Sequence, residues 1–180
     1  MQLSVDGYVA GPNGEMDWMA MGWGDDIKNY IIALTEPVDT ILLGRKLAEG
    51  FIPHWAALME NPETADIFTQ KMANTHKVVF SKTLTASAWD NTDLATGNLV
   101  EEVKKLKAMK GGDIITYGGA GFTSSLIKAG LIDEYHLFIN PAALGNGMPI
   151  FRDLKDRLNF KLVKSQAFEG GIVVLYYLPS

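Results

Sequence analysis

The sequence contains no cysteine among its 180 residues, and this absence removes several classes of site. Disulfide bonds and thiolate metal centres are excluded, and a reducing compartment is compatible with the composition. Long hydrophobic runs are also missing, because no apolar stretch approaches the roughly 20 residues that cross a bilayer. The N-terminus has no basic region followed by an apolar one, so no signal peptide is expected. These absences lead us to expect a cytoplasmic protein without a membrane partner.

The sequence also has fewer basic than acidic residues. Lysine and arginine number 16 against 21 aspartates and glutamates, which gives a net charge of −5 and an isoelectric point near 5.2. No basic stretch is dense enough for a nucleic-acid surface. His54, His76 and His136 are scattered without the paired spacing of metal ligands. We therefore expect neither a nucleic-acid partner nor a metal.

What the chain does have is apolar content for one core. Hydrophobic residues make up 47% of the sequence, and its length suits a single domain over residues 1–180. Strand-like and helix-like segments alternate through the first two thirds, which predicts an α/β fold with a mostly parallel central sheet flanked by helices. Two apolar strands around Gly170-Gly171 predict an antiparallel hairpin at one edge of that sheet.

The expected elements can be placed by range. Asn98 and Glu101 have the spacing of a capping box and predict a helix start. The glycine- and proline-rich stretch from Val5 to Met16 predicts a loop. Strands are predicted at residues 1–4, 40–43, 78–80, 135–139, 160–168 and 172–178 and from Ile114, and helices at residues 25–34 and 45–51, from Pro62, after Asn98 and after Gly121.

A glycine-rich turn is the most informative local feature. The apolar run from Ile114 ends in Gly118-Gly119-Ala120-Gly121, and a helix-like segment starting at Phe122 follows. Bare amides at a helix start form an anion site, and glycine lets a diphosphate approach the backbone because it has no Cβ. The alternative is a strand-to-helix turn that simply needs glycine. A Rossmann fingerprint is rejected, because the third glycine and the later acidic residue are absent.

Two other predicted strands end in similar groups. Leu42-Leu43 is followed by Gly44-Arg45-Lys46, and Val79-Phe80 is followed by Ser81-Lys82. Ligands of open α/β sheets bind outside the carboxyl ends of the strands, so cations, a hydroxyl and bare amides there favour a phosphorylated dinucleotide. Taken singly, Arg45 is also compatible with a surface ion pair and Ser81 with a turn or cap.

Acidic candidates lie near the first predicted helix, at Asp17, Asp25 and Asp26. A carboxylate there could hold an aminopyrimidine or pterin ring or help deliver a proton, and we take Asp26 as the candidate catalytic residue. The alternative is ordinary capping of the helix by Asp25 or Asp26.

Three motifs carry a resemblance to a known family. They are Asp6-Gly7-Tyr8-Val9-Ala10-Gly11-Pro12-Asn13-Gly14, Leu42-Leu43-Gly44-Arg45 and Tyr117-Gly118-Gly119-Ala120. The most specific stretch is Ala129-Gly130-Leu131-Ile132-Asp133-Glu134 with Pro141-Ala142-Ala143-Leu144-Gly145-Asn146-Gly147. Over essentially the whole chain, the sequence resembles the dihydrofolate-reductase-like fold, in the branch of the reductase domain of the riboflavin-pathway deaminase-reductase.

The resemblance implies an NADPH-dependent reductase that forms a homodimer. It assigns Gly44, Arg45, Lys46, Ser81 and Lys82 to the 2′-phosphate side, and Gly118, Gly119, Ala120, Gly121 and Phe122 to the diphosphate. It places Val9 and Ala10 against the nicotinamide, and adds Leu47, Phe80 and Tyr117 as cofactor contacts. Leu47 stands where the family usually has threonine. The fold also implies a cis peptide between Gly118 and Gly119.

The function that follows is a stand-alone NADPH-dependent reductase. Hydride would pass from the nicotinamide to a C=N or C=O bond of a planar heterocyclic small molecule. The alternative is a nucleotide- or pterin-binding protein of the same fold without turnover. Riboflavin-pathway or folate reduction is a third possibility, although the cysteine-ligated zinc deaminase domain of the riboflavin enzyme is absent here.

Overall fold

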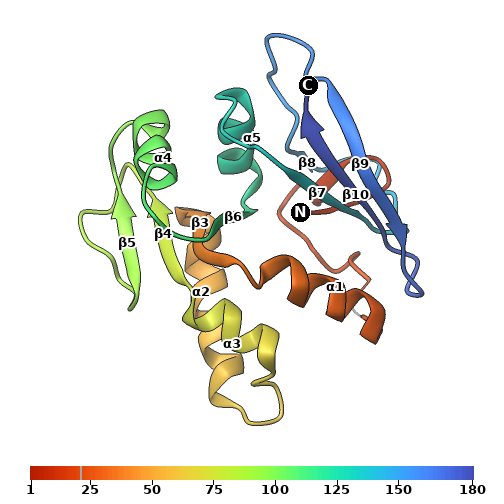
Figure 1. The fold of residues 1–180 in the computed structure, drawn as a ribbon, viewed down its shortest axis with the longest axis horizontal. Helices are drawn as coiled ribbons and strands as arrows, with labels where there is room; N and C mark the ends of the chain where they lie inside the picture. Colours follow the sequence, from red (N-terminus) through yellow and green to blue (C-terminus); the bar gives the residue numbers. More distant parts are fainter. Residues whose placement is uncertain (21) are drawn as a thin grey trace. The chain divides into compact units, whose positions relative to one another are not determined.

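The computed structural model describes residues 1–20 and 22–180 of the chain. These residues form two compact units, which are described separately. Unit 1 comprises Met1–Tyr30 and Thr123–Ser180, and unit 2 comprises Ile31–Phe122 (Figure 1). The prediction of one domain over the whole chain stays a prediction.

Unit 2 contains a four-stranded parallel sheet. Its strands are β3 (Val38–Gly44), β4 (His76–Phe80), β5 (Thr92–Ala95) and β6 (Asp113–Gly118), in the order β5-β4-β3-β6. β3 lies between β4 and β6, and the register pairs Gly44 with Phe80 and Leu43 with Gly118. The carboxyl ends of three neighbouring strands therefore lie together, as the sequence predicted for a parallel α/β sheet.

The helices of unit 2 begin at recognisable sequence signals. α2 (Arg45–Glu60) packs on β3 and β4, and α3 (Ile67–Asn74) packs on α2. The Asp66 side chain accepts a hydrogen bond from the Thr69 amide and so starts α3. The Asn98 side chain accepts from the amides of Val100 and Glu101 at the start of α4 (Leu99–Lys107), which confirms the predicted cap. The core joins Ile41, Leu43, Ala48, Met72 and Val79, all fully buried.

Unit 1 is built on a mixed sheet in the order β1-β7-β10-β9. Its strands are β1 (Gln2–Leu3), β7 (Tyr135–Ile139), β9 (Phe160–Ala167) and β10 (Val173–Pro179). β1 runs parallel to β7, whereas β10 is antiparallel to both β7 and β9. A separate pair joins β2 (Tyr8–Ala10) to β8 (Met148–Pro149). Residues of the unit 1 core include Leu3, Ile127, Tyr135, Leu137 and Ile150.

The chain passes from one unit to the other twice, and each time it does so inside a helix. α1 (Asp25–Thr35) begins in unit 1 and α5 (Ala120–Lys128) begins in unit 2. The predicted helix over residues 25–34 is therefore present, and a helix follows the glycine turn as expected. Among the described residues, no helix is long and apolar enough to cross a membrane.

The structure differs from the sequence expectations in four places. β2, β5 and β8 were not predicted, because they are short and lie in polar or glycine-rich segments. The hairpin β9–β10 pairs with β7, whose other neighbour is β1, so it belongs to a second sheet rather than to the edge of the parallel one. α2 continues past Pro53 to Glu60, since Phe51, Ile52 and Trp55 pack on the core. The helix expected from Pro62 begins only at Ile67, after its Asp66 cap.

Candidate functional site

The carboxyl ends of β4, β3 and β6 collect the predicted phosphate-binding residues of unit 2 (Figure 1). Gly44 ends β3 and is directly followed by α2, whose first residues are Arg45, Lys46 and Leu47. Phe80 ends β4 and Ser81 follows, while Gly118 ends β6 just before α5. Because these strands are parallel neighbours, three segments far apart in sequence become one edge.

Close packing explains why Gly44 has no side chain. A Cβ built on Gly44 would lie 2.8 Å from Cβ of Phe122, which is tighter than real Cβ contacts. The Phe122 ring also packs on Phe80, with 5.0 Å between ring centroids. The first turn of α5 is therefore held directly against the ends of β3 and β4. This contact fixes where the amides at the start of α5 lie relative to those strand ends within unit 2.

The glycine turn has the predicted backbone. The peptide bond between Gly118 and Gly119 is cis, which confirms the expectation. Gly118 has a φ of 129°, a conformation that side-chain-bearing residues rarely adopt. A Cβ on Gly119 would be in ordinary contact with Leu47, 3.9 Å from its Cβ. α5 starts at Ala120, so the unbonded amides of its first turn follow the glycine pair at once.

Ser81 is occupied within its own loop. Its hydroxyl oxygen accepts hydrogen bonds from the amides of Thr83 (3.1 Å) and Leu84 (3.0 Å), and the residue is buried. The Ser81 amide donates to the Ala95 carbonyl of β5 (3.1 Å). The alternative of a turn residue is therefore realised, and it leaves Lys82 exposed at the tip of this strand end.

The three cations at this edge are not equivalent. Arg45 forms an ion pair with Glu49 one turn along α2, as the alternative of a surface pair anticipated. Lys46 and Lys82 are exposed and make no hydrogen bond or ion pair with any described residue. An exposed i,i+4 pair contributes little to stability, typically about 0.3–0.5 kcal/mol. Arg45 can therefore exchange Glu49 for an anion at small cost.

Tyr117 brings an unsatisfied polar group beside the glycine turn. Its ring stacks on Phe51, with centroids 5.6 Å apart. Its hydroxyl is buried without a hydrogen-bond partner among the described residues, as is the hydroxyl of neighbouring Thr116. Burial raises the pKa of Tyr117, so the group stays a neutral donor. Thr116 was not predicted from the sequence, where it is only one polar residue within an apolar run.

Unit 1 holds the remaining predicted residues. Val9 and Ala10 lie on β2, where Ala10 is buried and paired with Met148. The Asp26 carboxylate accepts hydrogen bonds from two amides, those of Ile27 (2.7 Å) and Glu169 (2.9 Å). Asp26 thus ties the start of α1 to the turn between β9 and β10. The structure brings together the predicted residues of unit 2, and it places Val9, Ala10 and Asp26 in the other unit.

Comparison with known proteins now identifies the family. Residues 1–174 match the family described as the RibD C-terminal domain. The chain belongs to this family. The uncharacterized protein YyaP of Bacillus subtilis (strain 168) is 36% identical over an alignment of 181 positions, which covers 98% of this chain and 91% of YyaP.

Solved structures agree with this RibD C-terminal domain assignment. A Shewanella sp. PV-4 protein assigned to riboflavin biosynthesis has a TM-score of 0.78 at 25% identity, and the match covers 100% of this chain and 96% of that one. Dihydrofolate reductase from Enterococcus faecalis, complexed with NADP(H), has a TM-score of 0.62 at 16% identity, with coverages of 99% and 93%. The second likeness shows the dihydrofolate-reductase-like fold alone, which confirms the predicted fold family.

Two polar contacts of this RibD C-terminal domain escaped sequence reasoning. The Asp6 carboxylate binds backbone amides of Leu144 and Gly145, which are 138 and 139 residues away. The Asn140 side chain, fully buried, accepts from the Ala20 amide (3.1 Å). Asp6 and Gly145 each lie in a family motif, and that was the available signal, but no local pattern indicates that they bind each other.

A hollow of about 670 Å³ lies at the opposite end of the unit 2 strands. Its lining includes Val38 and His76, the first residues of β3 and β4, and none of the predicted site residues. Three of its polar side chains are bonded within the fold: the hydroxyls of Thr35 and Thr75 donate to carbonyls one turn earlier, and Lys71 donates to the Glu36 carbonyl. The hollow therefore does not coincide with the gathering of cations and helix-start amides at the carboxyl ends of the strands.

Proposed function

We propose that this RibD C-terminal domain protein is a stand-alone NADPH-dependent reductase. Its substrate class is a small planar heterocycle, or another carbonyl or imine compound, that accepts hydride at a C=N or C=O bond. The single observation that carries the proposal is the gathering of Gly44-Arg45-Lys46, Ser81-Lys82 and Gly118–Phe122 at the carboxyl ends of three neighbouring parallel strands.

The residues at this edge fit the charged parts of the cofactor. Arg45, Lys46 and Lys82 supply positive charge for a 2′-phosphate, and Arg45 has a planar fork that matches phosphate oxygens. The first amides of α5 and the dipole of that helix favour the diphosphate. Gly118 and Gly119 leave room there, because neither carries a Cβ. Leu47, Phe80, Tyr117 and Phe122 complete the predicted contacts in unit 2.

Three residues of unit 1 are proposed for the nicotinamide and the substrate. Val9 and Ala10 are proposed to lie against the nicotinamide, which supplies the hydride when the cofactor is bound. Asp26 is proposed as the carboxyl group that orients the substrate or delivers a proton. The protein's other contribution is orientation, since the chemistry belongs to the cofactor.

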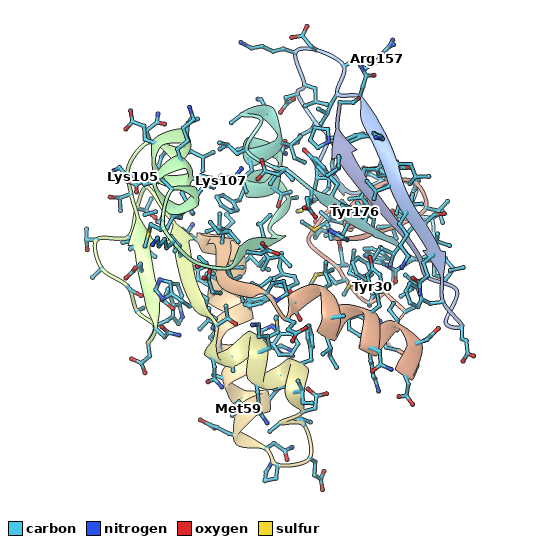
Figure 2. All side chains as sticks on the ribbon, in the orientation of Figure 1. Tyr30, Met59, Lys105, Lys107, Arg157 and Tyr176 are labelled. Carbon is cyan, nitrogen blue, oxygen red and sulfur yellow. The ribbon has the colours of Figure 1, made fainter. Side chains whose placement is uncertain are left out.

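The test is a titration of intrinsic tryptophan fluorescence with NADPH and with NADH. Wild type should prefer NADPH, because a 2′-phosphate adds a charge-assisted contact typically worth about 1.5–3 kcal/mol. Arg45→Ala should weaken NADPH binding about tenfold or more while changing NADH binding little. Arg157→Ala is the matched control, because Arg157 is an exposed arginine of unit 1 in the loop before β9 (Figure 2).

The titration also separates enzyme from binding protein. Oxidation of NADPH with members of a panel of pterins, aminopyrimidines and small carbonyl compounds supports a reductase. NADPH binding without oxidation by any member supports the alternative of a binding protein without turnover. Equal loss of NADPH and NADH binding in Arg45→Ala removes that residue from the phosphate site.

We further propose that the protein is a homodimer. β9 is the edge strand of the unit 1 sheet, and Leu162 and Val163 on it are 50% and 48% exposed. An eight-residue edge strand with exposed apolar side chains invites pairing unless it is covered. Light scattering at micromolar concentration should give twice the monomer mass of 19.7 kDa. A monomeric mass would contradict the proposal.

A further inference from the structure

One carboxylate connects two distant loops of unit 1. Asp6 follows β1, and Leu144 and Gly145 lie in the segment between β7 and β8. One oxygen of Asp6 accepts from the Gly145 amide at 2.7 Å, and both oxygens lie 3.1 Å from the Leu144 amide nitrogen. Backbone amides that bind a carboxylate form charge-assisted hydrogen bonds, which are the stronger class. Asp6 therefore fixes the second loop against the first.

Ser4 completes this arrangement from within the core. Its hydroxyl donates to Asp6 (2.6 Å) and accepts from the Tyr8 amide (2.9 Å), and Ser4 itself is fully buried. The Val5 amide adds a further bond to the Ala142 carbonyl (2.8 Å). The hydrogen bonds from Ser4, Leu144 and Gly145 lower the pKa of Asp6 to about 2, so it is ionised at neutral pH.

The joined loops meet at β2, the strand that carries Val9 and Ala10. A Cβ on Gly147 would overlap the Ala10 carbonyl oxygen and lie 2.9 Å from Cβ of Tyr8. β2 pairs with the two residues of β8, and its register shifts between Tyr8 and Ala10. A two-stranded pair of this size is marginal on its own. Its conformation therefore depends on the hydrogen bonds made on either side of it, which include those that Ser4 makes with Tyr8 and those that Asp6 accepts from Ser4, Leu144 and Gly145.

We propose that Asp6 is a positioning residue for the nicotinamide end of the cofactor. Through Ser4, Leu144 and Gly145, it holds Val9 and Ala10 in one conformation before any ligand binds. The inference rests on the proposed function, which places the nicotinamide against these two residues. Asp6 acts through the backbone of β2 and does not itself contact the cofactor. Preorganisation of this kind raises affinity, because the loop need not be ordered during binding.

The test is Asp6→Asn, which keeps the size of the side chain and directs an N–H donor towards backbone donors. In the cofactor-free protein, amide hydrogen exchange should accelerate at Leu144, Gly145 and Tyr8. Affinity should then be measured for NADPH and for adenosine 2′,5′-bisphosphate, which carries the phosphate end but no nicotinamide. NADPH affinity should fall about tenfold, through the added cost of ordering the loop. Bisphosphate affinity should not change.

Asp156→Asn is the matched control, because Asp156 is an exposed aspartate of unit 1 with no hydrogen bond or ion pair among the described residues. If Asp6→Asn does not fold, Ser4→Ala removes the bond that the Ser4 hydroxyl donates to Asp6 and the one that it accepts from the Tyr8 amide. NADPH affinity should then fall while bisphosphate affinity stays unchanged. Equal loss of NADPH and bisphosphate affinity, or no change in exchange at Tyr8, overturns the positioning role alone. A wild type that binds neither ligand overturns the proposed function, and this inference with it.

Discussion

The two units use their charged side chains in different ways near the predicted site residues. In unit 1, Asp6 and Asp26 direct their carboxylates at backbone amides of distant segments. In unit 2, Lys46 and Lys82 extend from the ends of parallel strands without a partner among the described residues. The carboxylates of unit 1 hold loops together, whereas the cations of unit 2 remain available to an external anion. The difference is consistent with the proposed function, in which the strand ends of unit 2 bind phosphate groups and the loops of unit 1 need a fixed conformation.

The same contrast applies within unit 2. Lys77 is a cation like Lys46, but it is only 2% exposed and its ammonium donates to the carbonyls of Ala73 (2.6 Å) and Thr75 (2.7 Å). The hydrogen bonds of Lys77 hold backbone segments of unit 2 together. Lys46, by contrast, is exposed to solvent, so an anion could approach its ammonium group. Three substitutions test the strand ends of unit 2, the buried Lys77 and the Asp26 carboxylate of unit 1, in order from the largest expected effect to the smallest.

Gly44→Val should reduce the free energy of unfolding most, because a side chain at this position would clash with Phe122. Gly44 has an ordinary extended backbone, with φ −75° and ψ 147°, so valine meets no backbone penalty there. Its Cβ would nevertheless meet Cβ of Phe122 at 2.8 Å, and Phe122 is fixed in the first turn of α5. Overpacking of this kind typically costs about 1–3 kcal/mol in free energy of unfolding. Urea denaturation should show that loss, and NADPH titration should show weakened binding.

Gly50→Ala is the control for Gly44→Val. Gly50 lies inside α2, and a Cβ there meets nothing within 4 Å. Alanine should stabilise the helix by about 0.5–1 kcal/mol and leave NADPH binding unchanged. If Gly44→Val binds NADPH as tightly as wild type, the carboxyl end of β3 is not part of the cofactor site.

The sequence was most informative where structure is set by neighbouring residues. The Asn98 cap, the strand before Gly44 and the cis peptide at Gly118-Gly119 were all predictable from local patterns or a family motif. The carboxyl ends of the parallel strands could be grouped, because parallel neighbours place equivalent ends side by side.

Structure that depends on distant partners was not predictable in the same way. β2 and β8 form only because residues about 140 positions apart pair with each other, and neither has a strand-like apolar pattern. The hydrogen bonds that Asp6 accepts from the amides of Leu144 and Gly145 also join residues far apart in the sequence. Likewise, the sequence could not decide whether Ser81 faces a ligand or its own turn, because both uses need the same hydroxyl.

Lys77→Met should have an intermediate effect, and its distinguishing feature is a dependence on pH. Burial lowers the pKa of Lys77 from 10.5 to about 8. Between these values the unfolded chain binds a proton that the folded protein lacks, so the free energy of unfolding of the wild type rises with pH. The rise is at most about 1.4 kcal/mol per pH unit. It should be absent from Lys77→Met, in which the buried group cannot titrate.

The measurement is the difference in free energy of unfolding between wild type and Lys77→Met. This difference should move in favour of wild type from about pH 8 to about pH 10. Lys46→Met replaces an exposed lysine and should show no such trend. A difference that stays constant across this range would mean that Lys77 is as readily charged in the folded protein as in the unfolded chain.

Substitution of Asp26 should give the smallest change in stability. It tests whether a carboxylate of unit 1 only holds loops together or also transfers a proton. Asp26→Asn removes the charge that accepts from the Glu169 amide. The loss should be about 1 kcal/mol in free energy of unfolding, the usual worth of one such bond. If Asp26 also carries the proposed proton transfer, turnover of a substrate found with the panel should fall by about 10²–10⁴. NADPH affinity should not change.

Glu169→Pro separates these two roles, because it removes the same hydrogen bond from the other side. Glu169 is the second residue of a turn closed by the bond from the Gly171 amide to the Phe168 carbonyl, and proline is favoured at that position. The variant should lose stability like Asp26→Asn but keep its turnover, since the Asp26 carboxylate remains. If both variants lose stability and both keep turnover, Asp26 is a loop-holding carboxylate like Asp6, and the proton must come from elsewhere. If Asp26→Asn alone loses turnover, the Asp26 carboxylate takes part in the reaction. Unit 1 then contributes a reacting group as well as carboxylates that hold loops together.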